Sequence, residues 1–152
     1  MDEAERIRVP RAAAWLGGAG LIPFVGLALA ALLAPIQIAA FAVAALGGYG
    51  AIILSFMGGC RWGFAAAGLG AGPTLGSLTV SVLPALFAWA CMLLPPAMQL
   101  PVLALGFLAL LGADLSLTRR GGAPAWWPAL RWPLTLGAVG SLAAAFVATL
   151  LR

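Results

Sequence analysis

Residues 47–63 of the chain read GGYGAIILSFMGGCRWG. Every fourth position in this stretch carries a small side chain: Gly47, Ala51, Ser55, Gly59 and Gly63. Because residues four apart lie one above another on a helix, this spacing predicts a narrow groove along one helix face. In a lipid bilayer, such a groove lets a second helix approach closely, so that dispersion contacts replace the hydrophobic drive that lipid cannot supply. We therefore predict that this helix is the packing axis of a membrane-embedded bundle.

The amino-acid composition places most of the chain in lipid. Of the 152 residues, 64% are hydrophobic and only 8% are charged. A soluble domain of this length could not bury so much apolar surface in its own core. The net charge of +4 does not indicate a nucleic-acid partner, because the arginines lie at the ends of apolar runs, as membrane-orienting charges do. The composition predicts an all-α integral membrane protein whose main partner is the lipid bilayer.

Titratable side chains are too few for most catalytic and metal sites. The chain has no histidine, and of its four acidic residues only Asp114 lies outside the first five positions. Histidine is the commonest metal ligand and general base, and a serine nucleophile would need such a base beside it. We therefore expect no catalytic residues, no metal and no cofactor. Cys60 and Cys91 are expected near opposite membrane faces, too far apart for a disulfide.

Apolar runs separated by turn residues predict a compact bundle of five transmembrane helices, over about residues 12–34, 36–60, 74–94, 98–118 and 133–151. Residues 1–11 are expected to form a polar tail, and residues 12–152 a single transmembrane domain. The first apolar run is longer than a usual signal-peptide core, and a second run follows it directly, so we expect it to be retained as a helix. Pro23 and Pro84 are expected to kink their helices.

The arginines are concentrated on one side of this predicted arrangement. The tail and the two expected loops, residues 61–73 and 119–132, hold Arg6, Arg8, Arg11, Arg61, Arg119, Arg120 and Arg131, whereas the far side holds only Arg152. Arginine and lysine are enriched in cytoplasmic loops of membrane proteins. We therefore predict a cytoplasmic N-terminus and a C-terminus on the opposite side of the membrane.

Asp114 is the most informative candidate for a site. An acidic side chain within a membrane span is costly unless it is paired or hydrated. We expect Asp114 about one turn from the cytoplasmic end of its helix, where Arg61, Arg119 or Arg131 can pair with it. A structural ion pair that closes this end of the bundle is the simpler interpretation. A proton, cation or ligand site is the functional alternative.

Three further groups of residues are candidates for binding or packing. Tyr49 and Ser55 are expected to face the bundle interior, where hydroxyl groups usually bond a carbonyl or a neighbouring helix. Trp62, together with Trp126, Trp127 and Trp132 near Arg119 and Arg131, suits either an interfacial anchor or a pocket for an anionic lipid head group. A second ladder of small residues predicts another packing face: Gly137, Ser141 and Ala145.

Four stretches carry a resemblance to a known family. They are LGGAGLIPF (16–24), GYGAIILSFMGGCRWG (48–63), SVLPALFAW (81–89) and PAWWPALRWPLTL (124–136). Together they resemble a family of small five-helix membrane proteins of unknown function, domain of unknown function 3429, which is related to mitochondrial transmembrane protein 69. The resemblance implies five helices and an inner-membrane location, and it brings no established activity or catalytic residues. Arg61 occupies a position where that family's pattern has Arg or His before Trp-Gly.

Two classes of function remain open. In the first, the bundle binds or transports a small apolar or lipid-like molecule. In the second, it is a structural or assembly subunit whose small-residue grooves contact its own copies or a larger membrane complex. We favour binding or transport, because a bundle that only packs would not need two prolines and an acidic residue within its spans, namely Pro23, Pro84 and Asp114. An enzyme is the third interpretation. The lysine-free composition, rich in Ala, Gly and Arg, together with the resemblance, favours the bacterial inner membrane, with the C-terminus in the periplasm.

Overall fold

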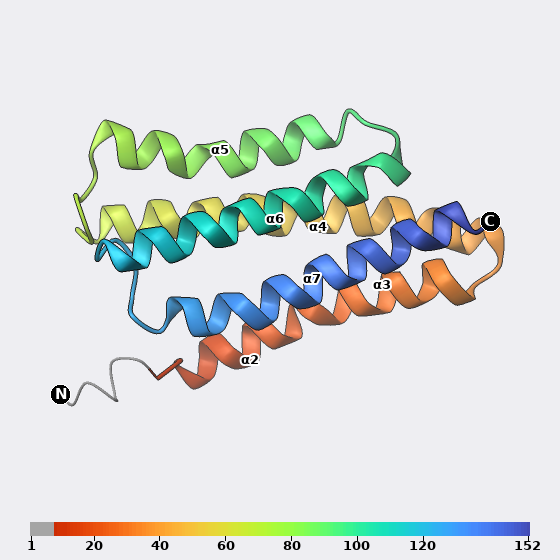
Figure 1. Ribbon diagram of the computed structural model, residues 1–152, viewed down its shortest axis with the longest axis horizontal. Helices are drawn as coiled ribbons and strands as arrows, with labels where there is room; N and C mark the ends of the chain where they lie inside the picture. The colour runs from red at the N-terminus through yellow and green to blue at the C-terminus, as the bar shows by residue number, and fades with distance from the viewer. Residues whose placement is uncertain (1–7) are drawn as a thin grey trace.

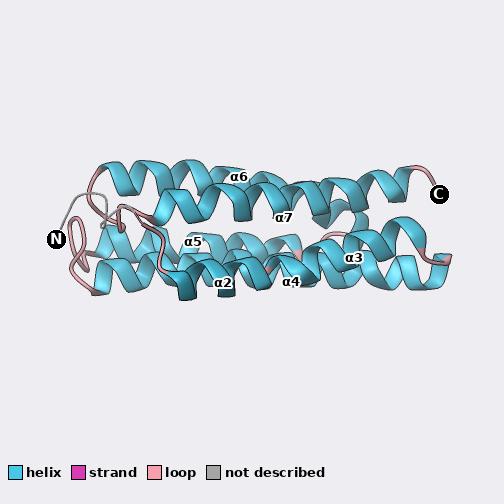
Figure 2. Ribbon diagram, turned by 90° about the horizontal axis from the view of Figure 1, so that it is seen from below, coloured by secondary structure: helices cyan, strands magenta, loops and turns pink. Residues whose placement is uncertain are grey.

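The structure is a computed structural model that describes residues 8–152. This part of the chain forms helices joined by short loops and contains no strand (Figure 2). The helices are α2 (Arg11–Ala19), α3 (Leu21–Leu33), α4 (Ile36–Ala66), α5 (Leu75–Cys91), α6 (Pro96–Arg119) and α7 (Trp127–Leu150). The predicted tail over residues 1–11 lies largely outside the described residues, and so does Arg6.

Five rods make up the bundle, because α2 and α3 form one rod with a break at Gly20 (Figure 1). The rods run roughly parallel to one long axis. Helix α4 occupies the centre, where it contacts α3, α5, α6 and α7. The prediction of an all-α bundle of five helices is confirmed.

Four of the rods are long and apolar enough to cross a membrane: Arg11–Leu33, Ile36–Ala66, Pro96–Arg119 and Trp127–Leu150. Helix α5 is apolar but shorter, with 17 residues. At 1.5 Å per residue it is about 25 Å long, slightly less than a hydrocarbon core of about 30 Å. It runs beside the C-terminal part of α4 (Figure 1).

Two helix ends differ from the sequence prediction in a way that matters for the site. Helix α4 continues to Ala66 instead of ending near residue 60, and the chain turns only at Gly68, whose φ of +80° suits glycine. Helix α7 begins at Trp127 instead of residue 133. Pro128 is accommodated there because the first helical N–H groups have no partner within the helix. As a result, Arg61 and Arg131 lie on helices and not in loops.

Other boundaries differ less. Helix α5 ends at Cys91, about a turn before the predicted residue 94, and α6 spans Pro96–Arg119 instead of 98–118. The first rod begins at Arg11 and ends at Leu33, close to the predicted 12–34, but it is divided at Gly20. Pro23 explains the division, because it has no N–H to donate to the carbonyl of Ala19.

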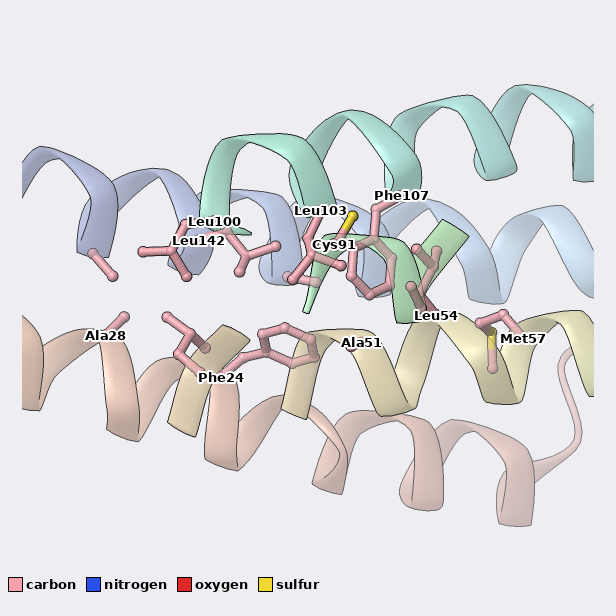
Figure 3. Close-up of a cluster of buried hydrophobic side chains, with 14 of the residues drawn as sticks. Phe24, Ala28, Ala51, Leu54, Met57, Cys91, Leu100, Leu103, Phe107 and Leu142 are labelled. Carbon is pink, nitrogen blue, oxygen red and sulfur yellow. The ribbon is translucent and has the colours of Figure 1, made fainter. Parts of the chain in front are cut away.

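The hydrophobic core lies where α3, α4, α6 and α7 meet (Figure 3). The rings of Phe24 on α3 and Phe107 on α6 pack edge to face with centroids 5.9 Å apart. Tyr49 on α4 also packs edge to face with Phe24, with centroids 5.0 Å apart. These aromatic contacts hold the first rod against the centre of the bundle.

The predicted groove on α4 is not a single packed face. Gly47 and Ala51 are buried, and a Cβ at Gly47 would collide with the side chain of Gln99. Ser55 is half-buried, whereas Gly59 and Gly63 are exposed and a Cβ on either would meet nothing within 4 Å. No described helix of this chain packs on the second half of the ladder, because each step of four residues turns about 40° beyond a full rotation, so a long ladder winds around the helix.

The ladder on α7 faces the bundle along its whole length. A Cβ at Gly137 would lie 2.8 Å from the side chain of Leu21 on α3. Ser141 and Ala145, one and two turns further on, are buried. Gly137, Ser141 and Ala145 are separated by only two intervals of four residues. The accumulated rotation around the helix axis is therefore too small to place any of them on the lipid-facing side.

Candidate functional site

Asp114 joins two arginines from different helices into one buried cluster, which we call the charge cluster. Arg61 Nη1 on α4 donates to Asp114 Oδ1 over 2.7 Å, and Arg131 Nε on α7 donates to Oδ2 over 2.9 Å. The side chain of Asp114 is 0% exposed, that of Arg61 9% and that of Arg131 3%. Asp114 thus pairs with two of the three predicted arginines at the same time.

All three residues lie near one end of the bundle, where α4 and α6 finish and α7 begins (Figure 1). Arg61 and Asp114 each precede the last residue of their helix by five positions, which is about 7.5 Å along the helix axis. Arg131 follows the first residue of α7 by four positions. The connection between α6 and α7 turns at Gly121, with φ +72°, and it brings Arg131 back beside Asp114.

The charge cluster carries a net charge of +1, because one carboxylate faces two guanidinium groups. Asp114 is the only acidic side chain within residues 8–152. Arg131 makes two further contacts: Nη1 donates to the sulfur of Met57 over 3.0 Å, and its Cζ lies 5.9 Å from the ring centroid of Trp127. A thioether is a weak acceptor, so these contacts do not neutralise the second positive charge.

Three buried polar atoms on α7 have no hydrogen-bond partner among the described residues: Trp127 Nε1, Arg131 Nη2 and Thr135 Oγ1. The three residues follow one another at intervals of four, so they share one face of the helix. Leaving a buried donor unpaired costs about 1–3 kcal/mol. Three such atoms in one row are therefore a costly arrangement for a helix whose only task is packing.

The same face of α7 borders a cavity of about 400 Å³, which we call the lateral cavity. Its walls come from the first rod, from α4 and from α7, and Phe107 of α6 closes it at depth. Trp127, Arg131 and Thr135 all line it, and nearly all other lining groups are apolar. Its volume falls in the range of small-molecule sites, about 300–1,000 Å³.

The lateral cavity opens sideways between α2 and α4. Leu16 on α2 and Phe56 on α4 line it, yet their side chains are 76% and 62% exposed. Within residues 8–152, α2 makes no backbone contact with α4, whereas α3 packs along it. Figure 1 shows α2 diverging from α4 beyond the break at Gly20. In a membrane, this opening would face the lipid.

Tyr49 stabilises the break that creates the opening. Its hydroxyl donates to the carbonyl of Gly20 over 2.9 Å, and its ring packs against Phe24 of α3. The hydrogen bond links α4 to the point where the first rod changes direction. Tyr49, which the sequence named as a binding residue, therefore holds the first rod against α4 and is not part of the charge cluster.

The remaining predicted binding residues lie apart from the cluster. Arg119 is exposed at the last residue of α6, where a positive charge is favourable beside the free carbonyls, and it does not pair with Asp114. Trp62 is 46% exposed on the surface of α4. Ser55 is half-buried on α4 and does not line the lateral cavity.

Sequence reasoning missed Met57, Cys60 and Thr135 as parts of the site. For Trp127, the sequence left open an interfacial anchor or a pocket for an anionic lipid head group; the residue is buried and packs edge to face with Phe64 at 4.9 Å. The signal was present in the spacing, since Trp127 and Thr135 lie four residues before and after Arg131. It was hidden because residues 119–132 were assigned to a loop.

Arg61 also borders a second cavity, of about 470 Å³, between α4, α5 and α6. None of the buried polar atoms without a partner belongs to its lining among the described residues. Within residues 8–152 no cluster of histidine, cysteine or acidic side chains could hold a metal ion. The lateral cavity is therefore the better candidate for a binding site.

The sequence pattern of the family described as "Protein of unknown function (DUF3429)" matches residues 9–147. This range contains the charge cluster and the walls of the lateral cavity. The chain belongs to this family. The description of DUF3429 assigns no activity.

Transmembrane protein 69 of Xenopus tropicalis is 41% identical to the chain over 143 residues, which are 91% of this chain and 54% of that protein. The chain thus spans about half the length of the curated relative it matches. The similarity supports the membrane assignment of this DUF3429 member. No solved structure matches the chain.

Proposed function

We propose that the protein binds a small apolar or lipid-like molecule in the lateral cavity, and that the molecule enters from the bilayer between α2 and α4. One observation carries the proposal: an otherwise apolar cavity of about 400 Å³ is lined by three residues that each keep one buried polar atom unpaired. A ligand with hydrogen-bonding groups would remove that cost, and its apolar part would fill the rest of the cavity.

We further propose that the protein lies in a bacterial inner membrane, with its N-terminus in the cytoplasm and its C-terminus in the periplasm. The orientation is supported by the exposed arginines, whose charges can determine which end of the bundle stays in the cytoplasm. Arg8, Arg11, Arg119 and Arg120 are exposed at the end of the bundle that holds the charge cluster, and Arg152 is at the other end. This asymmetry agrees with the positive-inside rule. Residues 12–152 would form one transmembrane domain.

The binding proposal is tested by blocking the cavity. Ala13 lines the lateral cavity, whereas its neighbour Ala12 is exposed and does not. We would compare wild type, Ala13→Trp and Ala12→Trp by native mass spectrometry after release from nanodiscs made with the host cell's own lipids. The expected result is a bound small molecule on wild type and Ala12→Trp that is absent from Ala13→Trp.

Two outcomes would contradict the binding proposal. One is a folded wild-type protein that never carries a small molecule. The other is a bound molecule that Ala13→Trp retains as fully as Ala12→Trp. Recovery of a stable homo-oligomer or membrane-complex partner, with an empty cavity, would favour the alternative of a structural or assembly subunit.

A further inference from the structure

We propose that the ligand of the lateral cavity is a single-chain amphiphile with an anionic oxygen head group, a carboxylate or a phosphate, held against Trp127, Arg131 and Thr135. This inference rests on the proposed function above and adds the chemical class of the ligand. The argument has three parts: the kind of hydrogen-bonding group that is missing, the charge that is not balanced, and the shape of the space.

The unpaired atoms call for an acceptor. Trp127 Nε1 and Arg131 Nη2 can only donate, and the hydroxyl of Thr135 can donate as well as accept. A head group that only accepts therefore suits each of these donors. An ammonium head group has no acceptor, and it would add a positive charge beside Arg131.

The unbalanced charge calls for an anion. Both oxygens of Asp114 already accept a hydrogen bond from an arginine, so the carboxylate has been used in holding Arg61 and Arg131 together. One positive charge is left in a site where both guanidinium groups are buried. Burial of an unbalanced charge in the membrane is costly. Charge-assisted hydrogen bonds to an anionic oxygen are about twice as strong as neutral ones.

Thr135 differs from the comparable buried hydroxyls of this protein. Ser141 on the same helix donates to the carbonyl of Gly137, and Ser81 on α5 donates to the carbonyl of Ser77, both over 2.8 Å. Thr135 is 1% exposed and makes no such bond. Its buried hydroxyl therefore has no hydrogen-bond partner among the described residues, whereas those of Ser81 and Ser141 have one.

The space suits one apolar chain. Beyond the three polar residues, the lateral cavity is lined by apolar side chains, including Phe24 and Leu130, and it opens to the lipid beside Leu16. A single chain can extend from the head group through this opening into the bilayer. The positions of the polar residues and the opening thus match an amphiphile that arrives from the membrane.

The experiment uses Cys60 as a reporter, because it is half-buried and lines the lateral cavity. Full-length protein in phosphatidylcholine nanodiscs is treated with N-ethylmaleimide, and labelling of Cys60 is followed by peptide mass spectrometry. Four probes are compared: hexadecanoate, hexadecyl phosphate, methyl hexadecanoate and hexadecyltrimethylammonium. Cys91, which is buried elsewhere in the core, reports whether the fold remains intact.

We expect at least one of the two anionic probes to slow the labelling of Cys60, at a concentration about tenfold lower than the methyl ester requires, since the charge-assisted hydrogen bonds add about 1–1.5 kcal/mol. The cationic probe should give no protection. Protection by the carboxylate would indicate a fatty acid as the source of the ligand. Stronger protection by the phosphate would indicate a phospholipid-derived head group.

Two variants remove one unpaired donor each without touching an ion pair. Thr135→Val and Trp127→Phe should each reduce the advantage of the anionic probe over the ester by about threefold to tenfold. Ser141→Ala is the matched control, because it removes a buried hydroxyl of the same helix that already has a partner. It should leave the preference unchanged.

Equal protection by the ester and the anionic probes, or stronger protection by the cation, would overturn the anionic head group while leaving binding in the cavity intact. The proposal is also overturned if no probe protects Cys60, or if Ser141→Ala changes the preference as much as Thr135→Val does. Binding as such is decided separately by the comparison of Ala13→Trp with Ala12→Trp, so the two proposals fail in distinguishable ways.

Discussion

At the scale of single residues, the charge cluster joins helices that are far apart in sequence. Asp114 lies 53 positions after Arg61 and 17 before Arg131, and it bonds both. The carboxylate is fully buried, so its two oxygens have no water to replace either arginine. Each partner therefore depends on Asp114, and removal of the carboxylate leaves two buried cations facing each other.

Asp114→Asn should strongly destabilise the protein. The amide keeps the shape of the side chain but loses the negative charge, and removing one partner of a buried ion pair costs about 3–5 kcal/mol. Thermal and denaturant unfolding in mild detergent would measure the loss. Arg119→Gln is the control, since Arg119 is exposed and outside the cluster, and it should change stability by less than about 0.5 kcal/mol. Equal stability of Asp114→Asn and wild type would contradict this account of the cluster.

Gly58 and Gly59 should respond in opposite ways to alanine. A Cβ at Gly58 would lie 2.5 Å from the backbone oxygen of Ser81 and 3.3 Å from Pro84, so α5 would have to move away from α4. A Cβ at Gly59 would meet nothing within 4 Å. We expect Gly58→Ala to cost about 1–3 kcal/mol and Gly59→Ala to be neutral or slightly stabilising. Unfolding of the two variants under identical conditions gives the comparison, and similar stabilities would contradict the packing described for α4 and α5.

At the scale of helices, the break in the first rod determines whether the lateral cavity is open. Helix α3 packs along α4 and α7, and Phe24 fixes its position in the core. Helix α2 contacts α7 but not α4, within the described residues, and the gap between α2 and α4 is the opening. The change of direction occurs at Gly20, next to the helical turn that contains Pro23. Access to the charge cluster therefore depends on the sequence of the first rod, although the three residues of the cluster lie on α4, α6 and α7.

Pro23→Ala should narrow the opening. Alanine restores an N–H that can donate to the carbonyl of Ala19, so α2 and α3 should become a straighter rod. The expected result is slower labelling of Cys60 by N-ethylmaleimide in the absence of any ligand. Pro101→Ala, on α6, is the control because Pro101 does not line the lateral cavity. Unchanged labelling in Pro23→Ala, with intact folding, would show that Pro23 does not hold the opening.

At the scale of the whole molecule, the charge cluster and the exposed arginines lie at the same end of the bundle. The opposite end carries Arg152, whose Nη2 donates to the carbonyls of Leu32 and Ala34 over 3.0 and 2.9 Å. Arg152 thus binds carbonyls at the end of α3 and also carries the positive charge of that end. The proposed orientation rests on the larger number of exposed arginines at the end that holds the charge cluster.

Reporter fusions should give the proposed orientation. Alkaline phosphatase fused after Arg152 should be active, and green fluorescent protein fused there should be dark, because the C-terminus would lie in the periplasm. Fusions in the loop after α6, near Arg120, should give the opposite signals. Replacement of Arg119 and Arg120 by glutamine should weaken the preference. A fluorescent C-terminal fusion would reverse the assigned topology.

Several features followed from the sequence because they depend on local pattern. Apolar runs separated by proline and glycine predicted the five rods, and Asp114 stood out because it is the only acidic residue far from the N-terminus. The pairing of Asp114 with Arg61 and Arg131 was among the predicted alternatives. The sequence did not show that Gly59 and Gly63 have no neighbour within this chain, since a ladder of small residues does not reveal how far it winds around the helix before its partner helix ends.

The sequence by itself determined that the chain is a bundle of apolar helices and that its single buried acid needs a cation. Both conclusions follow from properties that add up along the chain, namely hydrophobicity and charge. Only the tertiary structure decided that two arginines share Asp114, and that Trp127, Arg131 and Thr135 border one cavity with unpaired polar atoms. These features arise where α2, α3, α4, α6 and α7 meet, and their contacts depend on relative position, which no local pattern of residues encodes.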